Sequence, residues 1–332
     1  MPFITVIMPV YNTEIYLREA IDSVMNQSFQ EWELICVNDG STDNSLEILR
    51  YYKALDKRIV VINQKHSGTA AAARNMALKN AKGEYMQMLD SDDLLSKDCL
   101  EKSYIIALST QADLVVPDLI YFKGNYINQI YNSIGFKGNR HIVLSSEEAF
   151  TASLNWSISG VGLFRTKLVK KFQYDETGMN GDEYTTRLLL LNCNKIAFSE
   201  GAYYYRQHPE STTNKVSLKR FDRLLTDFRI LKLAEEYQIN EAGMVLCKKY
   251  IVDHILSLMY FYVGKRNCFN ENERIAIETQ LKTYYKKADR SFIVNEGHVL
   301  KFGFKNLLFI NFEILKMYAY FRLCFSSNIK IQ

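Results

Sequence analysis

The chain has 332 residues, of which 48% are hydrophobic and 23% are charged, and its formal net charge is +4. This composition is that of a globular protein that can bury a substantial core, and it excludes a disordered chain. The net charge is too small to indicate nucleic acid as a partner.

The cysteines and the first residues favour a cytoplasmic protein. None of the six cysteines forms a C-x-x-C pair, and several lie in apolar runs, where a thiol behaves as a small buried hydrophobe. A reducing compartment is the natural interpretation. Residues 1–10 have no basic region and no cleavage site, so they are predicted to form a core strand rather than a signal peptide. No stretch of eighteen uninterrupted apolar residues predicts a membrane-spanning helix.

Apolar runs alternate with amphipathic segments over the first third of the chain. The predicted strands are residues 3–10, 33–37, 58–62 and 85–89, and the predicted helices lie near 17–24, 42–49 and 70–81. This alternation predicts βαβ units and a mostly parallel sheet with right-handed crossovers. Ligands of such sheets bind beyond the carboxyl ends of the strands. Polar clusters stand at those positions: Tyr11-Asn12, Asn38-Asp39 and Asp90-Ser91-Asp92.

The middle of the chain is more mixed. We expect a strand at 114–122, helices at 147–153 and 185–191, and two short strands at 195–198 and 202–206. From about Ser217 onward glycines are few and the pattern is helical. The composition therefore changes near residue 215, which predicts an α/β domain over 1–215 and a helical region over 216–332.

Asp90-Ser91-Asp92 follows the fourth predicted strand directly. Two carboxylates on one side of a tight bend can share a divalent cation, because Mg²⁺ and similar hard cations prefer carboxylate oxygens, water and substrate phosphates. Such a metal would neutralise the charge that develops on a diphosphate leaving group. An Asp-x-Asp pair alone is a weak signal, but its position at the end of a parallel strand strengthens it.

Four segments in this order resemble inverting family 2 glycosyltransferases, which have the GT-A fold. The segments are Ile7-Met8-Pro9-Val10-Tyr11-Asn12, Val37-Asn38-Asp39-Gly40-Ser41-Thr42-Asp43, Gly68 with Ala73-Arg74-Asn75, and Leu89-Asp90-Ser91-Asp92-Asp93. The match is close over about 110 residues and looser to about residue 215. It implies a nucleotide-binding half at 1–110 and an acceptor-binding half at 111–215.

The resemblance also implies roles at the nucleotide and the metal. Asp39 matches the acid that accepts hydrogen bonds from the base, and Arg74 matches a basic residue beside the diphosphate. Asp92 matches the metal ligand, while Asp90 contacts ribose or a metal-bound water. The other residues placed at the nucleotide are Pro9, Tyr11, Glu14 and Ser91. In isolation Asp39-Gly40 would be only a turn, and Arg74 a solvated helix residue.

Gly181-Asp182-Glu183-Tyr184 resembles the Glu-Asp pair that opens a helix near the acceptor in this family. Asp182 aligns with the catalytic base, which takes the acceptor proton as its oxygen attacks the anomeric carbon. Gly181 replaces the usual glutamate, so the family's Glu-Asp pair can be aligned with this sequence in two ways that differ by one residue. Glu183 is therefore the second candidate for the base. The alternative is an acidic pair that only stabilises a helix N-terminus.

Tyr203-Tyr204-Tyr205-Arg206-Gln207-His208 resembles the segment that closes over the diphosphate in the family. There His208 would be a further metal ligand and Arg206 a phosphate partner. A structural histidine with satisfied hydrogen bonds is the competing interpretation.

Residues 299–325 are rich in aliphatic and aromatic side chains and carry four basic residues against a single acid. Such a helical segment can lie in a membrane interface, with its cations toward anionic headgroups. The alternatives are a core helix and a contact that forms a homo-oligomer. A membrane contact would place the protein at the inner face of the cytoplasmic membrane.

These observations predict a hexosyltransferase that uses Mn²⁺ or Mg²⁺ and transfers a sugar from a nucleotide-diphosphate donor to a saccharide or lipid-linked acceptor. The resemblance favours a UDP-sugar and surface polysaccharide synthesis. One alternative is an inactive glycosyltransferase-like assembly subunit. A sugar-phosphate nucleotidyltransferase is less favoured, because the loop after the first strand has neither glycine nor cation. A dehydrogenase would need G-x-G-x-x-G there.

Overall fold

The computed structural model describes residues 2–124, 129–178, 180–208, 216–289 and 311–327. The chain divides into two compact units. The first comprises residues 1–177 and 181–211, and the second comprises residues 178–180 and 212–332. Each unit has its own hydrophobic core.

The first unit begins with four parallel strands in the order β3-β2-β1-β4. Their bounds are β1 (Ile4–Val10), β2 (Trp32–Asp39), β3 (Ile59–Gln64) and β4 (Tyr85–Met88). Near-continuous apolar runs form these strands because both faces of the sheet are covered. Pro9, which has no N–H to donate, lies beyond the last residue of β1 that pairs with β4, Ile7.

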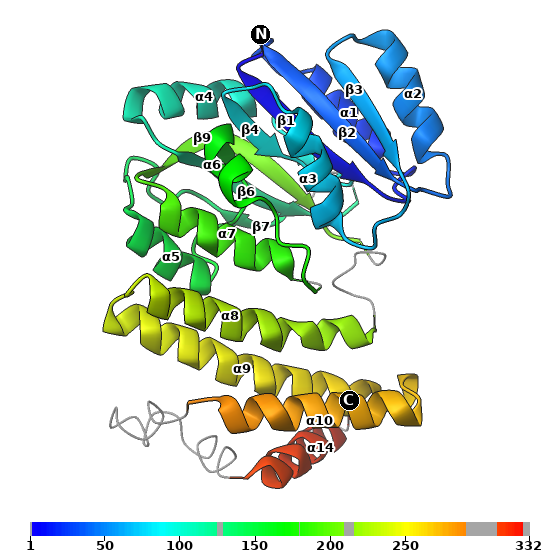
Figure 1. Ribbon diagram of the computed structural model, residues 1–332, viewed down its shortest axis with the longest axis vertical. Coiled ribbons are helices and arrows are strands. Elements are labelled where there is room, and N and C mark those ends of the chain that lie inside the picture. Colours follow the sequence, from blue (N-terminus) through cyan, green and yellow to red (C-terminus); the bar gives the residue numbers. More distant parts are fainter. Residues whose placement is uncertain (1, 125–128, 179, 209–215, 290–310, 328–332) are drawn as a thin grey trace. The chain divides into compact units, whose positions relative to one another are not determined.

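Helices cover both faces of the sheet (Figure 1). One face packs against α1 (Leu17–Met25), α2 (Ser45–Leu55) and α4 (Cys99–Thr110). The opposite face packs against α3 (Ala70–Asn80), α5 (Ser146–Leu154), α6 (Thr166–Phe172) and α7 (Gly181–Asn192). Alanines at 71, 73 and 77 let α3 lie close to the sheet. The predicted helices near 17–24, 42–49 and 70–81 are confirmed.

Beyond β4 the sheet is mixed and continues in the order β8-β6-β9-β5, with β7 paired to β6. The bounds are β5 (Leu94–Leu95), β6 (Leu114–Phe122), β7 (Gln129–Ser133), β8 (Leu163–Arg165) and β9 (Ile196–Arg206). Only the pairing of β6 with β9 is parallel among these described strands.

The expectation of two short strands at 195–198 and 202–206 is wrong, because β9 runs through both. Its register against β6 shifts between Val116 and Asp118, so the Ser199–Gly201 stretch bulges out of the ladder. Gly201 is needed there, since a Cβ would lie 2.7 Å from the Cα of Cys99. The glycine therefore allows a close approach between β9 and α4.

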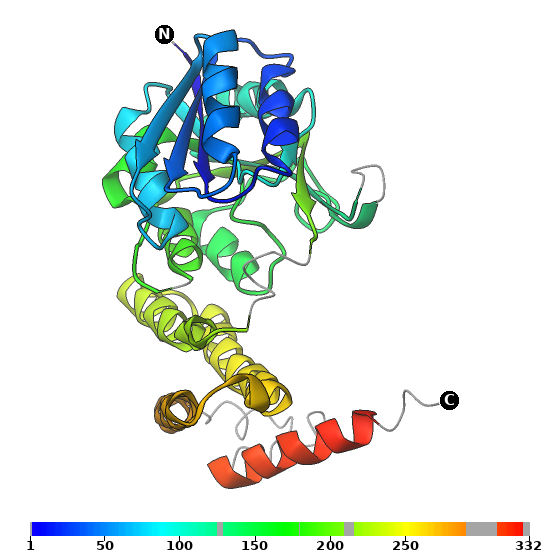
Figure 2. The ribbon, with the colours of Figure 1, turned by 90° about the vertical axis from the view of Figure 1, so that its right-hand side faces the viewer.

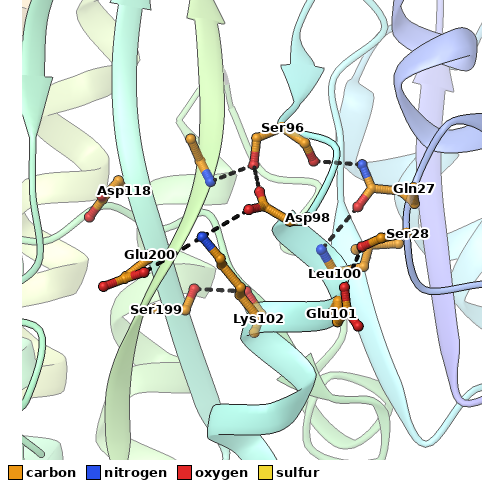
Figure 3. Close-up of polar contacts among 12 residues, drawn as sticks. Gln27, Ser28, Ser96, Asp98, Leu100, Glu101, Lys102, Asp118, Ser199 and Glu200 are labelled. Atoms are coloured by element: carbon orange, nitrogen blue, oxygen red, sulfur yellow. Dashed lines mark hydrogen bonds and ion pairs between the residues drawn. The ribbon is translucent and has the colours of Figure 1, made fainter.

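A hydrogen-bond network fixes the start of α4 (Figure 3). The Gln27 amide donates to the carbonyl of Ser96 at 2.7 Å and accepts from the N–H of Leu100 at 3.0 Å. The Ser96 hydroxyl donates to Asp98, and Asp98 is paired with Lys102 at 2.8 Å. The network joins the end of α1 to the strand β5, which directly follows the Asp90–Asp93 loop.

The second unit is helical, as predicted from residue 217 onward. Its described residues form α8 (Arg223–Glu236), α9 (Glu241–Lys265), α10 (Glu271–Lys287) and α14 (Phe312–Ser327), together with the 3₁₀ helices η2 (Leu218–Asp222) and η3 (Arg266–Cys268) (Figure 2). Phe221, Ile255, Tyr262, Leu281 and Leu315 lie in its core. Among the described helices, none has the length and apolar character needed to cross a bilayer.

Candidate active site

The loops after β1 and β2 are joined by reciprocal hydrogen bonds. The Asn12 side chain accepts from the N–H of Thr42 at 2.8 Å, and the Glu14 carboxylate accepts from the N–H of Asn44 at 2.8 Å. Asp43 in turn accepts from the N–H of Glu14 at 3.0 Å. Burial raises the pKa of Asp43, but hydrogen bonds from the N–H of Glu14 and from Ser45 outweigh it and hold the pKa below its usual value. Glu14 therefore already has protein partners, and its role at a nucleotide stays a prediction.

Asp39 ends β2 in a buried, polar environment. One carboxylate oxygen accepts from Gln64 at 2.6 Å and from the N–H of Ser67 at 2.9 Å, and the other lies 3.0 Å from Nδ1 of His66. The His66 ring stacks on Tyr11, with centroids 4.1 Å apart. A carboxylate offers about four lone pairs, so Asp39 keeps capacity for a further donor. The structure thus brings predicted residues Tyr11 and Asp39 together around His66.

Arg74 is a buried cation that connects two parts of the site. It lies in α3 with 5% of its surface exposed, and it donates to Asp90 at 3.0 Å. On its other side it lies 3.8 Å from the carboxylate of Asp182. Burial opposes its charge, yet Asp90 and Asp182 raise the pKa of Arg74 above its usual value. One guanidinium therefore links the Asp-x-Asp loop to the start of α7.

Asp92 and His208 meet at the carboxyl edge of the sheet. Oδ2 of Asp92 lies 2.9 Å from Nε2 of His208, whose ring packs 4.8 Å from that of Tyr16. Burial and then the charge of Asp90 raise the pKa of Asp92. Among the described side chains, no group of three or more histidine, cysteine or acidic residues is arranged to hold a metal ion.

The other loop residues hold the Asp-x-Asp segment in place. Asp93 is buried and accepts from the Tyr203 hydroxyl at 2.8 Å and from the N–H of Arg206 at 2.8 Å. The same Tyr203 hydroxyl accepts from the N–H of Asp90 at 3.2 Å. Ser91 accepts from the Thr13 hydroxyl at 3.0 Å. Asp93 and Tyr203 were not among the predicted site residues.

The Arg206 guanidinium is directed at protein groups. It donates to the carbonyl of Asp92 at 2.8 Å and to the carboxylate of Glu19 at 2.7 Å, and it packs over the rings of Tyr16 and Phe122. These contacts make Arg206 a support of the Asp-x-Asp loop. Its predicted contact with a phosphate stays a prediction.

Asp182 and Glu183 open α7, but their surroundings differ. The Asp182 side chain is half exposed (50%) and faces Arg74, whereas the Glu183 side chain is 12% exposed and lies 3.7 Å from the buried Arg187. Although half of the side chain remains exposed, its partial removal from water raises the pKa of Asp182; Arg74 lowers this pKa, and Glu183 and Asp90 raise it again. The net shift is upward. Of these two acids, Asp182 is the one that combines exposure with a link to the Asp-x-Asp loop through Arg74.

Two side chains of this site could not be found from sequence patterns. His66 stands in a polar stretch without a recognisable motif, and Tyr174, whose ring lies under the Arg74 guanidinium at 5.6 Å, precedes a turn far along the chain. Both are brought to the site by the sheet and its crossovers rather than by sequence spacing.

A parallel sheet with acids and a buried arginine at its carboxyl edge is typical of α/β proteins that bind nucleotides there. Comparison with known proteins identifies the family to which the chain belongs. Residues 5–159 match the model of glycosyl transferase family 2. Glycosyltransferase GlyG of Streptococcus pneumoniae is 33% identical over 227 residues, which cover 63% of this chain and 72% of GlyG. The chain belongs to glycosyltransferase family 2.

Other similarities extend over more of the chain. The minor teichoic acid biosynthesis protein GgaA of Bacillus subtilis is 27% identical over 307 residues, 87% of this chain and 67% of GgaA. The structure of S. aureus TarS 1–349 in complex with UDP-GlcNAc superposes with a TM-score of 0.70 at 20% identity, covering 96% of this chain and 89% of that one. The predicted GT-A fold with a helical C-terminal region is confirmed. The chain spans only 33% to 48% of the length of several other curated relatives.

Proposed function

We propose that this chain transfers a sugar from a UDP-sugar to a hydroxyl of a saccharide acceptor, with inversion at the anomeric carbon. The observation that carries the proposal is the bridge by Arg74, which ties the Asp-x-Asp loop through Asp90 to the acid Asp182. A nucleotide-binding edge and a positioned base are the two parts that a sugar transfer needs. The similarity to GgaA supports an acceptor in cell-surface polysaccharide synthesis.

The residues divide between donor and acceptor. Tyr11 and Asp39 face the base and Arg74 the diphosphate, while Asp182 is the base that takes the acceptor proton. Glu183 is less suited to that task, because it is mostly buried against Arg187 and would have to leave its partner. In this assignment the first unit is catalytic, and its residues 111–177 and 181–211 make up most of the predicted acceptor-binding half at 111–215.

Asp92 and His208 would hold a divalent cation, Mn²⁺ or Mg²⁺. Oδ2 of Asp92 and Nε2 of His208 lie 2.9 Å apart, so both atoms could serve as ligands of one cation. Two protein ligands suffice, because such ions commonly keep waters and bind substrate phosphates. When bound, the cation would neutralise charge on the departing diphosphate.

The proposal is tested by incubating the purified chain with UDP, GDP and dTDP, with and without Mn²⁺, and measuring the melting temperature. A nucleotide that binds the folded chain at a hundred times its Kd stabilises it by about 2.7 kcal/mol. We expect stabilisation by UDP that depends on Mn²⁺, followed by UDP release from a UDP-sugar. No response to any nucleotide would favour the inactive assembly subunit.

The pH dependence of transfer should report the raised pKa of Asp182. The base must be ionised, so activity is present above this pKa and is lost as the pH falls through it. We expect the acidic limb of kcat/KM to lie above the value of about 3.9 for an unperturbed aspartate. In Arg74→Gln the limb should move higher still, because Arg74 lowers the pKa of Asp182. A limb that moves down in this variant would contradict the assignment.

The proposal includes a contact of the second unit with an anionic membrane surface. On α14 the side chains of Ile314, Met317 and Phe321 are 44%, 66% and 64% exposed, at a spacing that puts them on one side of the helix. Leu315 and Ala319, on the other side, are buried. Residues 212–332 carry twenty lysines and arginines against twelve acids, whereas residues 1–211 carry twenty-one against twenty-five. Of the predicted segment 299–325, residues 299–310 lie outside the described residues.

This contact predicts a loss of membrane binding in the double variant Met317→Glu/Phe321→Glu. Wild type should float with vesicles that contain phosphatidylglycerol and not with pure phosphatidylcholine, because binding combines apolar burial with charge attraction. The matched control is Ile105→Glu/Leu108→Glu, which changes two exposed apolar residues of α4. Equal flotation of both double variants would contradict the membrane contact. A dimer in sedimentation that the α14 variant loses would assign this face to a second copy instead.

A further inference from the structure

Helix α5 ends in a backbone motif that normally contains glycine. The N–H of Ser157 donates to the carbonyl of Ala152 at 3.0 Å, and the N–H of Trp156 donates to that of Ser153 at 3.3 Å. These two bonds form a Schellman motif, in which the residue after the C-cap adopts the left-handed conformation. Here the C-cap is Asn155 and the left-handed residue is Trp156, with φ of 60°. A large side chain at this position is strained, whereas glycine would not be.

Burial does not explain why a tryptophan occupies that position. Trp156 is 51% exposed, although the chain's other tryptophan, Trp32, is 1% exposed. One side of the Trp156 indole rests on the guanidinium of Arg187, 5.3 Å from the ring centroid. Strained backbone conformations such as that of Trp156 cluster at binding and catalytic sites, where burial of the side chain is not what explains them.

The support beneath the ring is a buried, hydrogen-bonded arginine. Arg187 is 2% exposed and donates to the carbonyls of Ser153 and Glu183, both at 3.1 Å. It therefore joins the end of α5 to the first turn of α7. The turn after Trp156 is also close to α7, since a Cβ at Gly160 would lie 2.7 Å from the Thr186 hydroxyl. One face of the indole therefore contacts Arg187, and about half of the Trp156 surface remains exposed to solvent.

The ring is also linked to the helix that carries the proposed base. Its support, Arg187, follows Asp182 by five residues on α7, which corresponds to about 8 Å along the helix axis and about 140° around it. A saccharide whose hydroxyl reaches Asp182 would extend over this part of the surface. The polar groups of α7 would face its hydroxyls, and the indole would face the apolar side of a sugar ring.

We propose that Trp156 is the stacking platform for the saccharide acceptor, positioned by Arg187 and by the Schellman motif of α5. The inference rests on the proposed sugar transfer and names the acceptor subsite of that same centre. The left-handed backbone turns the indole outward, and the buried arginine keeps it there. Trp156 therefore determines the affinity for the acceptor and does not affect binding of the donor.

The first test uses tryptophan fluorescence, because Trp32 is buried and Trp156 is not. The probes are the methyl β-glycosides of glucose, galactose and N-acetylglucosamine, with mannitol as a polyol control. We expect at least one glycoside to change the emission of wild type and to protect it from acrylamide quenching, and neither effect in Trp156→Phe. Emission unaffected by all three glycosides would overturn the proposal. Stabilisation by UDP, measured separately, tells whether the donor site itself is in place.

The second test compares two substitutions with opposite structural consequences. Trp156→Gly relieves the strained backbone, so its melting temperature should equal or exceed that of wild type. Its KM for a glycoside that stimulates UDP release should nevertheless rise at least tenfold, with the KM for the UDP-sugar unchanged. Trp156→Phe keeps both the strain and an aromatic face, and it should recover much of the affinity. A glycoside KM that is unchanged in Trp156→Gly would overturn the proposal.

Discussion

Replacing Asp182 by asparagine should lower kcat for transfer roughly 10²–10⁴-fold, the usual contribution of a positioned general base. Asparagine has nearly the same shape but does not take up a proton at neutral pH. Donor binding should survive, because Asp182 contacts Arg74 only at 3.8 Å and Asp90 remains to hold that guanidinium. The measurements are initial rates of UDP release with acceptor present and the stabilisation by UDP with Mn²⁺.

The neighbouring acid supplies the matched control for this experiment. In Glu183→Gln we expect less than a tenfold decrease in kcat, because Glu183 is largely buried and faces Arg187. The two residues are adjacent and both open α7, so a general disturbance of the helix would affect both variants alike. A larger loss in Glu183→Gln than in Asp182→Asn would reverse the assignment of the base.

Much of the first unit could be predicted because its signals are local. Continuous apolar runs predict buried parallel strands, and the polar clusters at their ends had to meet at one edge of the sheet. Asp39 and Asp92 stand in these clusters, whereas Arg74 and Asp182 were predicted from the family resemblance. The structure brings Arg74 within reach of both Asp90 and Asp182.

The directions of the long side chains could not be predicted. Arg206 was expected at a phosphate, but its flexible side chain has acceptors in Glu19 and in the Asp92 carbonyl. Glu14 likewise bonds to Asn44, because the loops after β1 and β2 lie side by side. These contacts depend on how neighbouring loops lie against each other in the fold, which the spacing of residues in the sequence does not predict.

Backbone motifs were also hidden in the sequence. Gly201 lies in the gap between the two predicted strands, yet it belongs to β9 and allows that strand to pass close to α4. Trp156 shows the opposite case, since a position that favours glycine holds the bulkiest side chain. In both, tertiary contacts decide the local conformation, which propensity alone cannot predict.

Asp92→Ala should abolish the metal-dependent part of nucleotide binding. If wild type is stabilised by about 2.7 kcal/mol at a hundred times the Kd of UDP, its melting temperature rises by about 5–10 °C for a domain of this size. The variant keeps Tyr11, Asp39 and Arg74 but loses the carboxylate that lies 2.9 Å from His208. We therefore expect Mn²⁺ to add nothing to its response to UDP.

Two further variants separate a metal site from a structural ion pair. Asp253→Ala removes an exposed acid of α9 and should leave the response to UDP and Mn²⁺ unchanged. His208→Ala should weaken the Mn²⁺ dependence, because a cation bound through Asp92 would lose its nitrogen ligand. If Asp92 and His208 only stabilise each other, both alanine variants would melt at lower temperature yet respond fully to UDP with Mn²⁺. That result would make the pair a link between the Asp-x-Asp loop and the end of β9, and the cation would have to be held elsewhere.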